Sequence, residues 1–339
     1  MIQRNDSNTL ISTPEILVAE NLWKSYGSRK ALQGLSFSMQ AGRVLGFLGP
    51  NGAGKTTSIR ILTTIMEPES GHFIIDGIGS EHPDEIRQRI GVLPENLGFP
   101  RQMTGIEYLT YFGQLYGRTA IEARDYGNKL LEDVGLQHRG KSLIGSYSHG
   151  MRQRIGIARA LVNQPVVVFL DEPTLGLDPR GQRELLDLIK RIAREQSAGV
   201  VLCSHLLSEV EGVCDDVVIL NLGQIVAKGT VAEVIGQVQK NVLLNYALRI
   251  QIHPHDVNKA QEALKTIPSI LSVDPINETE GLLRIRIAEP IDSKIADPYL
   301  INNKVLSALI HAKIPILRFE AEGGKLQDVF LQLTEDTVK

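Results

Sequence analysis

Two short segments of this sequence carry residues suited to binding and cleaving a phosphate anhydride. The first, Gly-Pro-Asn-Gly-Ala-Gly-Lys-Thr-Thr at positions 49–57, fits the pattern GxxxxGK(S/T). Its glycines let successive backbone N–H groups surround a phosphate, while Lys55 would reach the β- and γ-phosphates and the Thr56 hydroxyl would hold Mg²⁺. The residues expected to bind the nucleotide here are Gly49, Pro50, Asn51, Gly52, Ala53, Gly54, Lys55, Thr56 and Thr57.

The second segment is an apolar run, Val166 to Leu170, that ends in the carboxylates Asp171 and Glu172. If this run is a buried parallel strand, both carboxylates lie at the edge of the sheet where ligands bind. Asp171 then suits the Mg²⁺ shell, and Glu172 suits a base or orienter for the attacking water. Taken alone, such a pair belongs more often to the start of a helix. The phosphate-loop pattern upstream favours the catalytic interpretation.

The surrounding pattern predicts how these segments are positioned. Short apolar alternations from Ile16 to Gly46 indicate a small antiparallel sheet that leads into a buried strand, Val44 to Leu48, which ends at the glycine loop. Apolar residues three or four apart then run from Ile59 to Met66, so a helix should follow the loop and stop near Pro68. This gives a strand-loop-helix unit.

Farther along, apolar residues at helical spacing predict an inserted helical subdomain over about 99–162. The apolar runs 166–170 and 199–203 flank a helix around 185–192, which is typical of a parallel sheet covered on both faces. We therefore expect an α/β fold, a P-loop nucleotide hydrolase core with an antiparallel β subdomain and a helical subdomain.

After about Gln237 the pattern changes. Apolar and charged residues alternate at 248–252 and 283–287, with a helical stripe from Val257 to Ile267 between them. A further strand at 273–277, a helix at 300–311 and a last strand at 316–319 complete the order strand-helix-strand-strand-helix-strand. This order predicts a small α+β domain of the ferredoxin-like type.

Length and composition indicate two domains with hydrophobic cores. The chain has 339 residues, 42% of them hydrophobic, and a net charge of −3, so there is no general basic field for nucleic acid. Cys203 and Cys214 indicate a reducing compartment. Apolar runs are far shorter than the roughly 20 residues that a membrane span needs.

The expected divisions are a disordered leader at 1–14, a nucleotide hydrolase domain at 15–236 and an accessory domain at 237–339.

A third motif, Tyr147-Ser148-His149-Gly150-Met151, precedes a basic amphipathic helix start and lies between the phosphate loop and Asp171. Over roughly residues 16–235 this order resembles the ATP-binding subunits of ABC transporters. The resemblance implies that Ser148 and Gly150 bind the γ-phosphate of ATP held by a second subunit. It also implies that Tyr26 stacks on adenine, that Asp178 belongs to the loop coupling the two sites, and that His205 contacts the γ-phosphate.

Two positions depart from the family pattern. The family signature is Leu-Ser-Gly-Gly-Gln, of which this chain keeps only Ser148 and Gly150. The family glutamine that ligates Mg²⁺ corresponds to Glu95, whose carboxylate can still ligate the metal but adds a charge beside the γ-phosphate.

The end of the chain, Lys325 to Thr334, resembles the terminal helix of drug-resistance exporter ATPases that carry a C-terminal accessory domain. The resemblance implies an ATPase that uses ATP and Mg²⁺, a transmembrane permease on a separate chain, a second ATPase subunit, and a place on the cytoplasmic face of the plasma membrane. The main alternative is a soluble ABC ATPase that serves repair, translation or cluster assembly. A P-loop kinase or nonhydrolytic module would leave Ser148, Asp178 and His205 unexplained.

Overall fold

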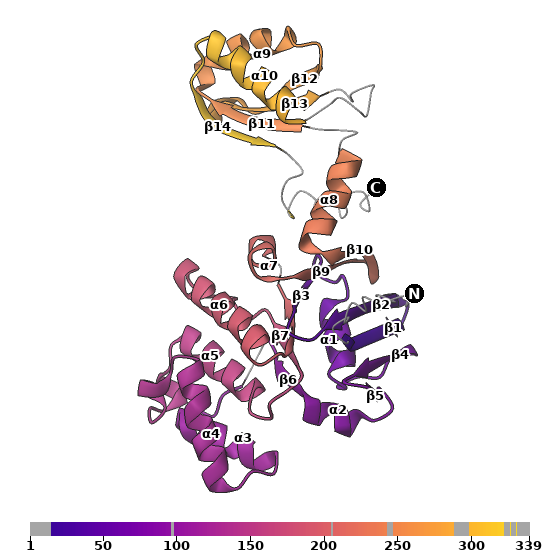
Figure 1. Cartoon of the computed structure of the whole chain (residues 1–339), viewed down its shortest axis with the longest axis vertical. Coiled ribbons are helices and arrows are strands. Elements are labelled where there is room, and N and C mark those ends of the chain that lie inside the picture. The colour runs from indigo at the N-terminus through magenta and orange to yellow at the C-terminus, as the bar shows by residue number, and fades with distance from the viewer. Residues whose placement is uncertain are drawn as a thin grey trace, which may run out of the picture. The chain divides into compact units, whose positions relative to one another are not determined.

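The computed structural model describes residues 15–95, 98–204, 206–242, 247–287 and 298–321, together with Leu326 and Phe330. His205, the predicted leader and most of the predicted terminal helix lie outside the described residues. The chain divides into two compact units, Met1–Val231 and Ala232–Lys339 (Figure 1). The division falls at the start of helix α8 (Val231–Val242), whereas the sequence predicted a boundary after residue 236.

The first unit is organised around a six-stranded sheet with the order β10-β9-β3-β8-β7-β6. Its strands are β3 (Val44–Leu48), β6 (Ile90–Leu93), β7 (Val167–Asp171), β8 (Gly199–Cys203), β9 (Asp216–Asn221) and β10 (Gln224–Thr230). All neighbouring pairs are parallel except β10 with β9. Every residue of β3 and β8 is buried, as expected of strands covered on both faces. The predicted α/β core is confirmed.

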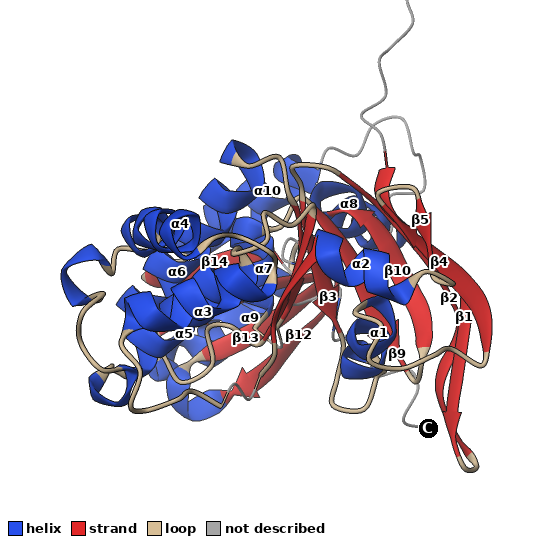
Figure 2. Cartoon of the chain, turned by 90° about the horizontal axis from the view of Figure 1, so that it is seen from below, coloured by secondary structure: helices blue, strands red, loops and turns tan. Residues whose placement is uncertain are grey.

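A four-stranded antiparallel sheet packs beside this core. It contains β1 (Glu15–Tyr26), β2 (Arg29–Gln40), β4 (Ser70–Ile75) and β5 (Ile78–Gly79), in the order β2-β1-β4-β5. An edge-to-face contact between Phe37 of β2 and Phe47 of β3, with ring centroids 5.0 Å apart, joins the two sheets. In Figure 2, this antiparallel sheet lies on the opposite side of β3 from helices α3, α4 and α5.

The helix after the phosphate loop, α1 (Lys55–Leu62), is shorter than predicted. The apolar spacing extended it to Met66, but the Thr63 hydroxyl donates to the Ile59 carbonyl at 2.7 Å and Thr64 adopts φ 59°. A left-handed residue cannot continue a right-handed helix, so the chain leaves the helix before Met66.

The helical subdomain contains α3 (Gly105–Leu115), α4 (Ala120–Asp133) and α5 (His149–Ala160), with short 3₁₀ turns at Gln137–Arg139 and Ile144–Ser146. Reciprocal side-chain and backbone hydrogen bonds fix the starts of α3 and α4, between Thr104 and Glu107 and between Thr119 and Glu122. The remaining helices of this unit are α2 (Pro83–Arg89), α6 (Pro179–Glu195) and α7 (Leu207–Val213).

The second unit follows the predicted order. After α8, its elements are β11 (Ala247–Ile252), α9 (Val257–Lys265), β12 (Ile270–Asn277), β13 (Leu282–Ile287), α10 (Pro298–His311) and β14 (Ile316–Ala321), with 3₁₀ turns at Pro254–Asp256 and Glu278–Glu280. The strands form an antiparallel sheet, β12-β13-β11-β14. Buried side chains of the sheet and of both helices share one core. Among the described helices of the whole chain, none has the length and apolar character needed to cross a bilayer.

Candidate nucleotide-binding site

The phosphate loop connects β3 to α1 in a conformation that depends on glycine. Gly54 has φ 111°, and a Cβ added there would lie 2.7 Å from the Ala31 carbonyl oxygen. A Cβ at Gly49 would lie 2.5 Å from the Leu220 carbonyl oxygen. Side chains at these two positions would therefore push the loop away from the neighbouring strands.

The start of α1 is suited to an anion. Gly54 occupies the N-cap, where no side chain accepts a hydrogen bond from the first helical turn. The amides of Lys55, Thr56 and Thr57 lie in that turn, where N–H groups have no intrahelical acceptor and the helix dipole is positive. The Lys55 ammonium donates to the carbonyl oxygens of Gly49 at 2.5 Å and Pro50 at 3.3 Å, so it lies across the loop. This arrangement fits a bound phosphate chain.

A group of carboxylates lies at the carboxyl end of β7. β8 separates β7 from β3 in the sheet, so the ends of these strands share one edge. Burial raises the pKa of Asp171 to about 6, assisted by the nearby charges of Glu172 and Glu95 and opposed by Lys55 and Arg60. The structure thus brings Glu172, Glu95 and Lys55 within electrostatic reach of Asp171.

The carboxylates at this edge and the Thr56 hydroxyl could bind Mg²⁺ together with the phosphate oxygens of a bound nucleotide. Crowded carboxylates favour a cation, and Mg²⁺ commonly takes one or two carboxylates together with phosphate oxygens and water. Within the described ranges, no cluster of three or more His, Cys, Asp or Glu side chains could hold a metal ion by itself. The oxygen atoms of the Asp171 carboxylate and the Thr56 hydroxyl are ligands of the kind that Mg²⁺ takes together with phosphate oxygens.

Glu172 is held in an uncommon backbone conformation. Its φ is 49°, in the left-handed region that costs a non-glycine residue about 1 kcal/mol or more. Its N–H donates to the Cys203 carbonyl at 3.0 Å, and its carbonyl accepts from Leu175 at 3.2 Å. The chain turns here directly after the last residue of β7, and the neighbouring backbone fixes that turn.

Ser148 and Asp178 both begin helices. The Met151 N–H donates to Ser148 Oγ at 3.2 Å, which caps α5, and the Gly181 N–H donates to Asp178 Oδ1 at 3.1 Å, which caps α6. Both capping residues are exposed. A Cβ at Gly150 would lie 3.5 Å from Leu177 Cδ2, so the two helix starts are neighbours.

Tyr26 lies at the end of β1, where its side chain is 46% exposed and its hydroxyl contacts Met66 Sδ at 3.2 Å. It pairs with Arg29 of β2, whose guanidinium donates to the Gly52 carbonyl at 3.3 Å. The end of this hairpin therefore lies against the phosphate loop. Arg29 was not predicted as part of the site, because a single basic residue after a turn carries no local signal for this contact.

Glu209 of α7, which is 5% exposed, was also not predicted as part of the site. Its Oε2 accepts hydrogen bonds from Thr174 Oγ1 and Ser204 Oγ, both at 2.8 Å, while its Oε1 has no partner among the described residues. Ser204 Oγ also accepts from the Leu206 N–H at 3.0 Å. Glu209 therefore joins the end of β8 to the turn that follows Glu172. His205 itself is outside the described residues.

Comparison with known proteins identified related chains over nearly the whole length. A family model described as ABC transporter matches residues 32–175. The linearmycin resistance ATP-binding protein LnrL of Bacillus subtilis is 32% identical over 96% of this chain and 100% of its own length. The daunorubicin/doxorubicin resistance ATP-binding protein DrrA of Streptomyces peucetius is 32% identical over 92% and 90%, respectively. The bacitracin transport ATP-binding protein BcrA of Bacillus licheniformis is 42% identical over 62% and 68%.

Solved structures resemble about two thirds of the chain. The structure of an ATP-binding subunit of an ABC transporter has a TM-score of 0.59 and 31% identity, covering 66% of this chain and 93% of that one. CbiO1 from Clostridium perfringens, part of an ABC transporter complex, has a TM-score of 0.60 and 28% identity, covering 68% and 95%. The matched family segment contains Lys55, Ser148 and Glu172, whereas Tyr26, Asp178 and His205 lie beyond its ends.

Proposed function

The chain belongs to the ABC transporter family of ATP-binding proteins, and from this premise we propose that it is the ATP-hydrolysing subunit of an exporter whose membrane-spanning part is a separate chain. The observation that carries the proposal is the electrostatic grouping of Lys55 with Asp171 and Glu172 at one edge of the central sheet. The rival assignment, a soluble ABC ATPase without a permease, finds no support in the relatives described above, which are resistance or transport ATP-binding proteins by name.

The proposed roles follow from these positions. The loop from Gly49 to Gly54 and the first amides of α1 hold the phosphates, and Lys55 neutralises their charge. Thr56, Asp171 and Glu95 would hold Mg²⁺, which would supply charge neutralisation when bound. Glu172 orients the attacking water and accepts its proton. By the family resemblance, Tyr26 supplies a face for the adenine ring and His205 a contact to the γ-phosphate.

We place two chains in the working assembly. Ser148, Gly150 and Asp178 lie at two adjacent helix starts, and the side chains of Ser148 and Asp178 are exposed. An exposed helix start can offer its N–H groups and a hydroxyl to phosphate held by another subunit. Each ATP would then be bound between the phosphate loop of one subunit and the Ser148 region of the other, which is either a second copy or a paralogue. Closure and hydrolysis would alternate.

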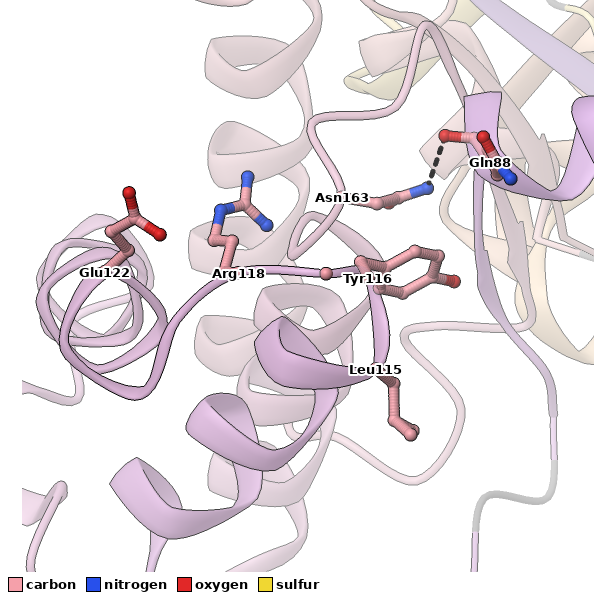
Figure 3. A pocket seen from close by; sticks show the side chains of 7 residues that line it. Gln88, Leu115, Tyr116, Arg118, Glu122 and Asn163 are labelled. Carbon is pink, nitrogen blue, oxygen red and sulfur yellow. Dashed lines mark hydrogen bonds between the residues drawn. The ribbon is translucent and has the colours of Figure 1, made fainter.

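The permease has a candidate docking pocket on the first unit. A pocket of about 850 Å³ is lined by Gln88, Leu115, Tyr116, Gly117, Arg118, Glu122 and Asn163 (Figure 3). Its lining comes from α2, from the segment between α3 and α4 with the adjoining helix ends, and from Asn163 after α5, whose Nδ2 donates to the Gln88 carbonyl at 3.0 Å. Leu115 and Tyr116 are 62% and 45% exposed, which suits an apolar permease segment bordered by polar groups. Binding there would hold the chain at the membrane surface, on its cytoplasmic face.

Replacing Lys55 with alanine should weaken ATP binding by tenfold or more, which is about 1.4 kcal/mol or more, because charge-assisted bonds to phosphate are lost. Titration calorimetry with ATP and Mg²⁺ measures this. Lys30→Ala removes the same charge from an exposed position on β2 and serves as the control. Unchanged affinity in the Lys55 variant would remove the loop from the proposed site.

The exporter assignment is tested by affinity purification from membranes of the source cells. The wild-type chain should copurify with a multi-span membrane protein, and Leu115→Asp should reduce its recovery by tenfold or more, because a buried unpaired carboxylate is costly. Ile121→Asp is the matched control, since Ile121 is 75% exposed on α4 and does not line the pocket. Failure of the wild type to recover any membrane protein would favour the soluble alternative.

A further inference from the structure

His149 makes a contact that the proposed roles do not use. It follows Ser148 at the start of α5, and its Nε2 lies 2.7 Å from the carbonyl oxygen of Leu175. A carbonyl oxygen only accepts hydrogen bonds, so Nε2 carries the proton in this contact. The bond joins two segments 26 residues apart in the sequence.

The residue after Leu175 packs against the same ring. Gly176 has φ 75°, and a Cβ added there would lie 3.3 Å from His149 Nε2. Close by, Leu177 Cδ2 would lie 3.5 Å from a Cβ at Gly150. The run 148–150 and the loop 175–178 therefore lie side by side, and the His149 hydrogen bond joins them.

The loop 175–178 is also held on its other side. The Leu175 N–H donates to the Glu172 carbonyl at 3.2 Å and the Leu177 N–H to the Thr174 carbonyl at 3.1 Å. Thr174 is in turn bound to the buried carboxylate of Glu209. These bonds connect the loop to the core, whereas His149 connects it to the helical subdomain.

We propose that His149 is a positioning residue. Its hydrogen bond holds the run 148–150 against the loop 175–178, so that the two segments form one ordered surface for the second subunit before ATP binds. The inference rests on the proposed two-chain site. A surface that is already ordered loses less conformational entropy on association, so the hydrogen bond favours dimer closure. Twofold symmetry gives each dimer two such contacts, so both change in a single variant.

Two substitutions at one position separate the hydrogen bond from the bulk of the ring. His149→Gln places an amide N–H donor near the position of Nε2, whereas His149→Asn places it near the position of Nδ1, short of Leu175. Both are compared in a Glu172→Gln background, in which hydrolysis does not reopen the dimer. Sedimentation velocity then gives the ATP concentration at half-maximal dimerisation.

His149→Asn should raise this concentration on the order of tenfold, from the loss of two modest hydrogen bonds, and His149→Gln should stay within about twofold of the parent. At protein concentrations low enough to keep the chain monomeric, the affinity for ATP should be unchanged in both variants. A general structural defect would lower that affinity. Hydrogen exchange of the amides at 174–178 in the nucleotide-free chain should accelerate with Asn and not with Gln.

The inference would be overturned if the parent, the His149→Gln variant and the His149→Asn variant dimerised equally well with ATP and exchanged these amides at equal rates. Equal losses of dimerisation with His149→Gln and His149→Asn would overturn it as well. They would show that the effect comes from the bulk of the imidazole ring and not from its Nε2–H hydrogen bond. A parent that fails to dimerise with ATP would instead count against the proposed function, and the exchange experiment would still decide whether His149 orders the loop.

Discussion

Glu172→Gln is expected to lower the rate of ATP hydrolysis by about 10²- to 10⁴-fold, the contribution of a positioned general base, with ATP affinity retained. An amide of nearly the same shape replaces the carboxylate but cannot accept the proton of the attacking water. Because the phosphate loop and Lys55 are unaltered, nucleotide should still bind. The two-chain complex should then accumulate in its closed, ATP-bound form.

The backbone at position 172 makes this substitution informative. Glu172 has φ 49°, and its N–H and carbonyl are both hydrogen bonded to neighbouring backbone. Glutamine has no greater difficulty than glutamate in the left-handed region, so the turn should persist and only the carboxylate chemistry changes. A glycine or proline at this position would alter the backbone as well and would not isolate the base.

A coupled assay of phosphate release measures the rate of ATP hydrolysis. Sedimentation velocity in the presence of ATP measures the fraction of the protein that is dimeric. Glu195→Gln is the matched control, because it removes a carboxylate whose side chain is 69% exposed on α6. Retained turnover in the Glu172 variant would exclude Glu172 as the base. Lost turnover together with lost ATP binding would indicate a disturbed site and not a missing base.

Much of the fold was predictable because local patterns coincide with buried faces. β3 and β8 are continuous apolar runs, since both faces of each strand are covered. β11 and β13 alternate apolar with polar residues, since only one face packs on α9 and α10. The phosphate loop was predictable for a different reason, which is that its glycines and lysine are adjacent in sequence.

Some contacts near the site were not predicted from the sequence. They join residues that are far apart along the chain, or residues that come together only in one register of paired strands. Thr174 and Glu209 are 35 residues apart, and neither lies in a pattern that indicates the other. The contact between His149 and Leu175 likewise depends on where α5 and the turn after β7 are placed. The helix end at Leu62 was missed because apolar periodicity continues to Met66, while the hydroxyl of Thr63 and the left-handed Thr64 end the helix locally.

Ser148 shows how a structural role and a proposed functional role can occupy one residue. Its Oγ caps α5 through the Met151 N–H, a role that does not depend on nucleotide. Capping also orients the first amides of the helix toward solvent, where phosphate held by a second subunit could meet them. A substitution at Ser148 therefore affects the cap and the proposed shared site together, and the control must separate them.

If the second subunit is another copy of this chain, Ser148→Arg should abolish nearly all hydrolysis, because a long side chain at the exposed helix start would prevent closure on the other subunit's ATP. Loss of the cap alone should cost only about 1 kcal/mol of stability. Thr119→Arg is the matched control, since Thr119 is also an exposed N-cap, of α4, and lies outside the proposed shared site. The control should keep most of its activity.

Mixing Ser148→Arg with Lys55→Ala tests whether the site is completed by a second chain. Each mixed dimer would hold one intact site, made of the normal phosphate loop of the first variant and the normal Ser148 of the second. Random pairing makes half the dimers mixed, so activity should recover to about a quarter of the wild-type value. Activity of the mixture equal to the sum of the two separate preparations would contradict a shared site and would leave Ser148 only its role as the cap of α5.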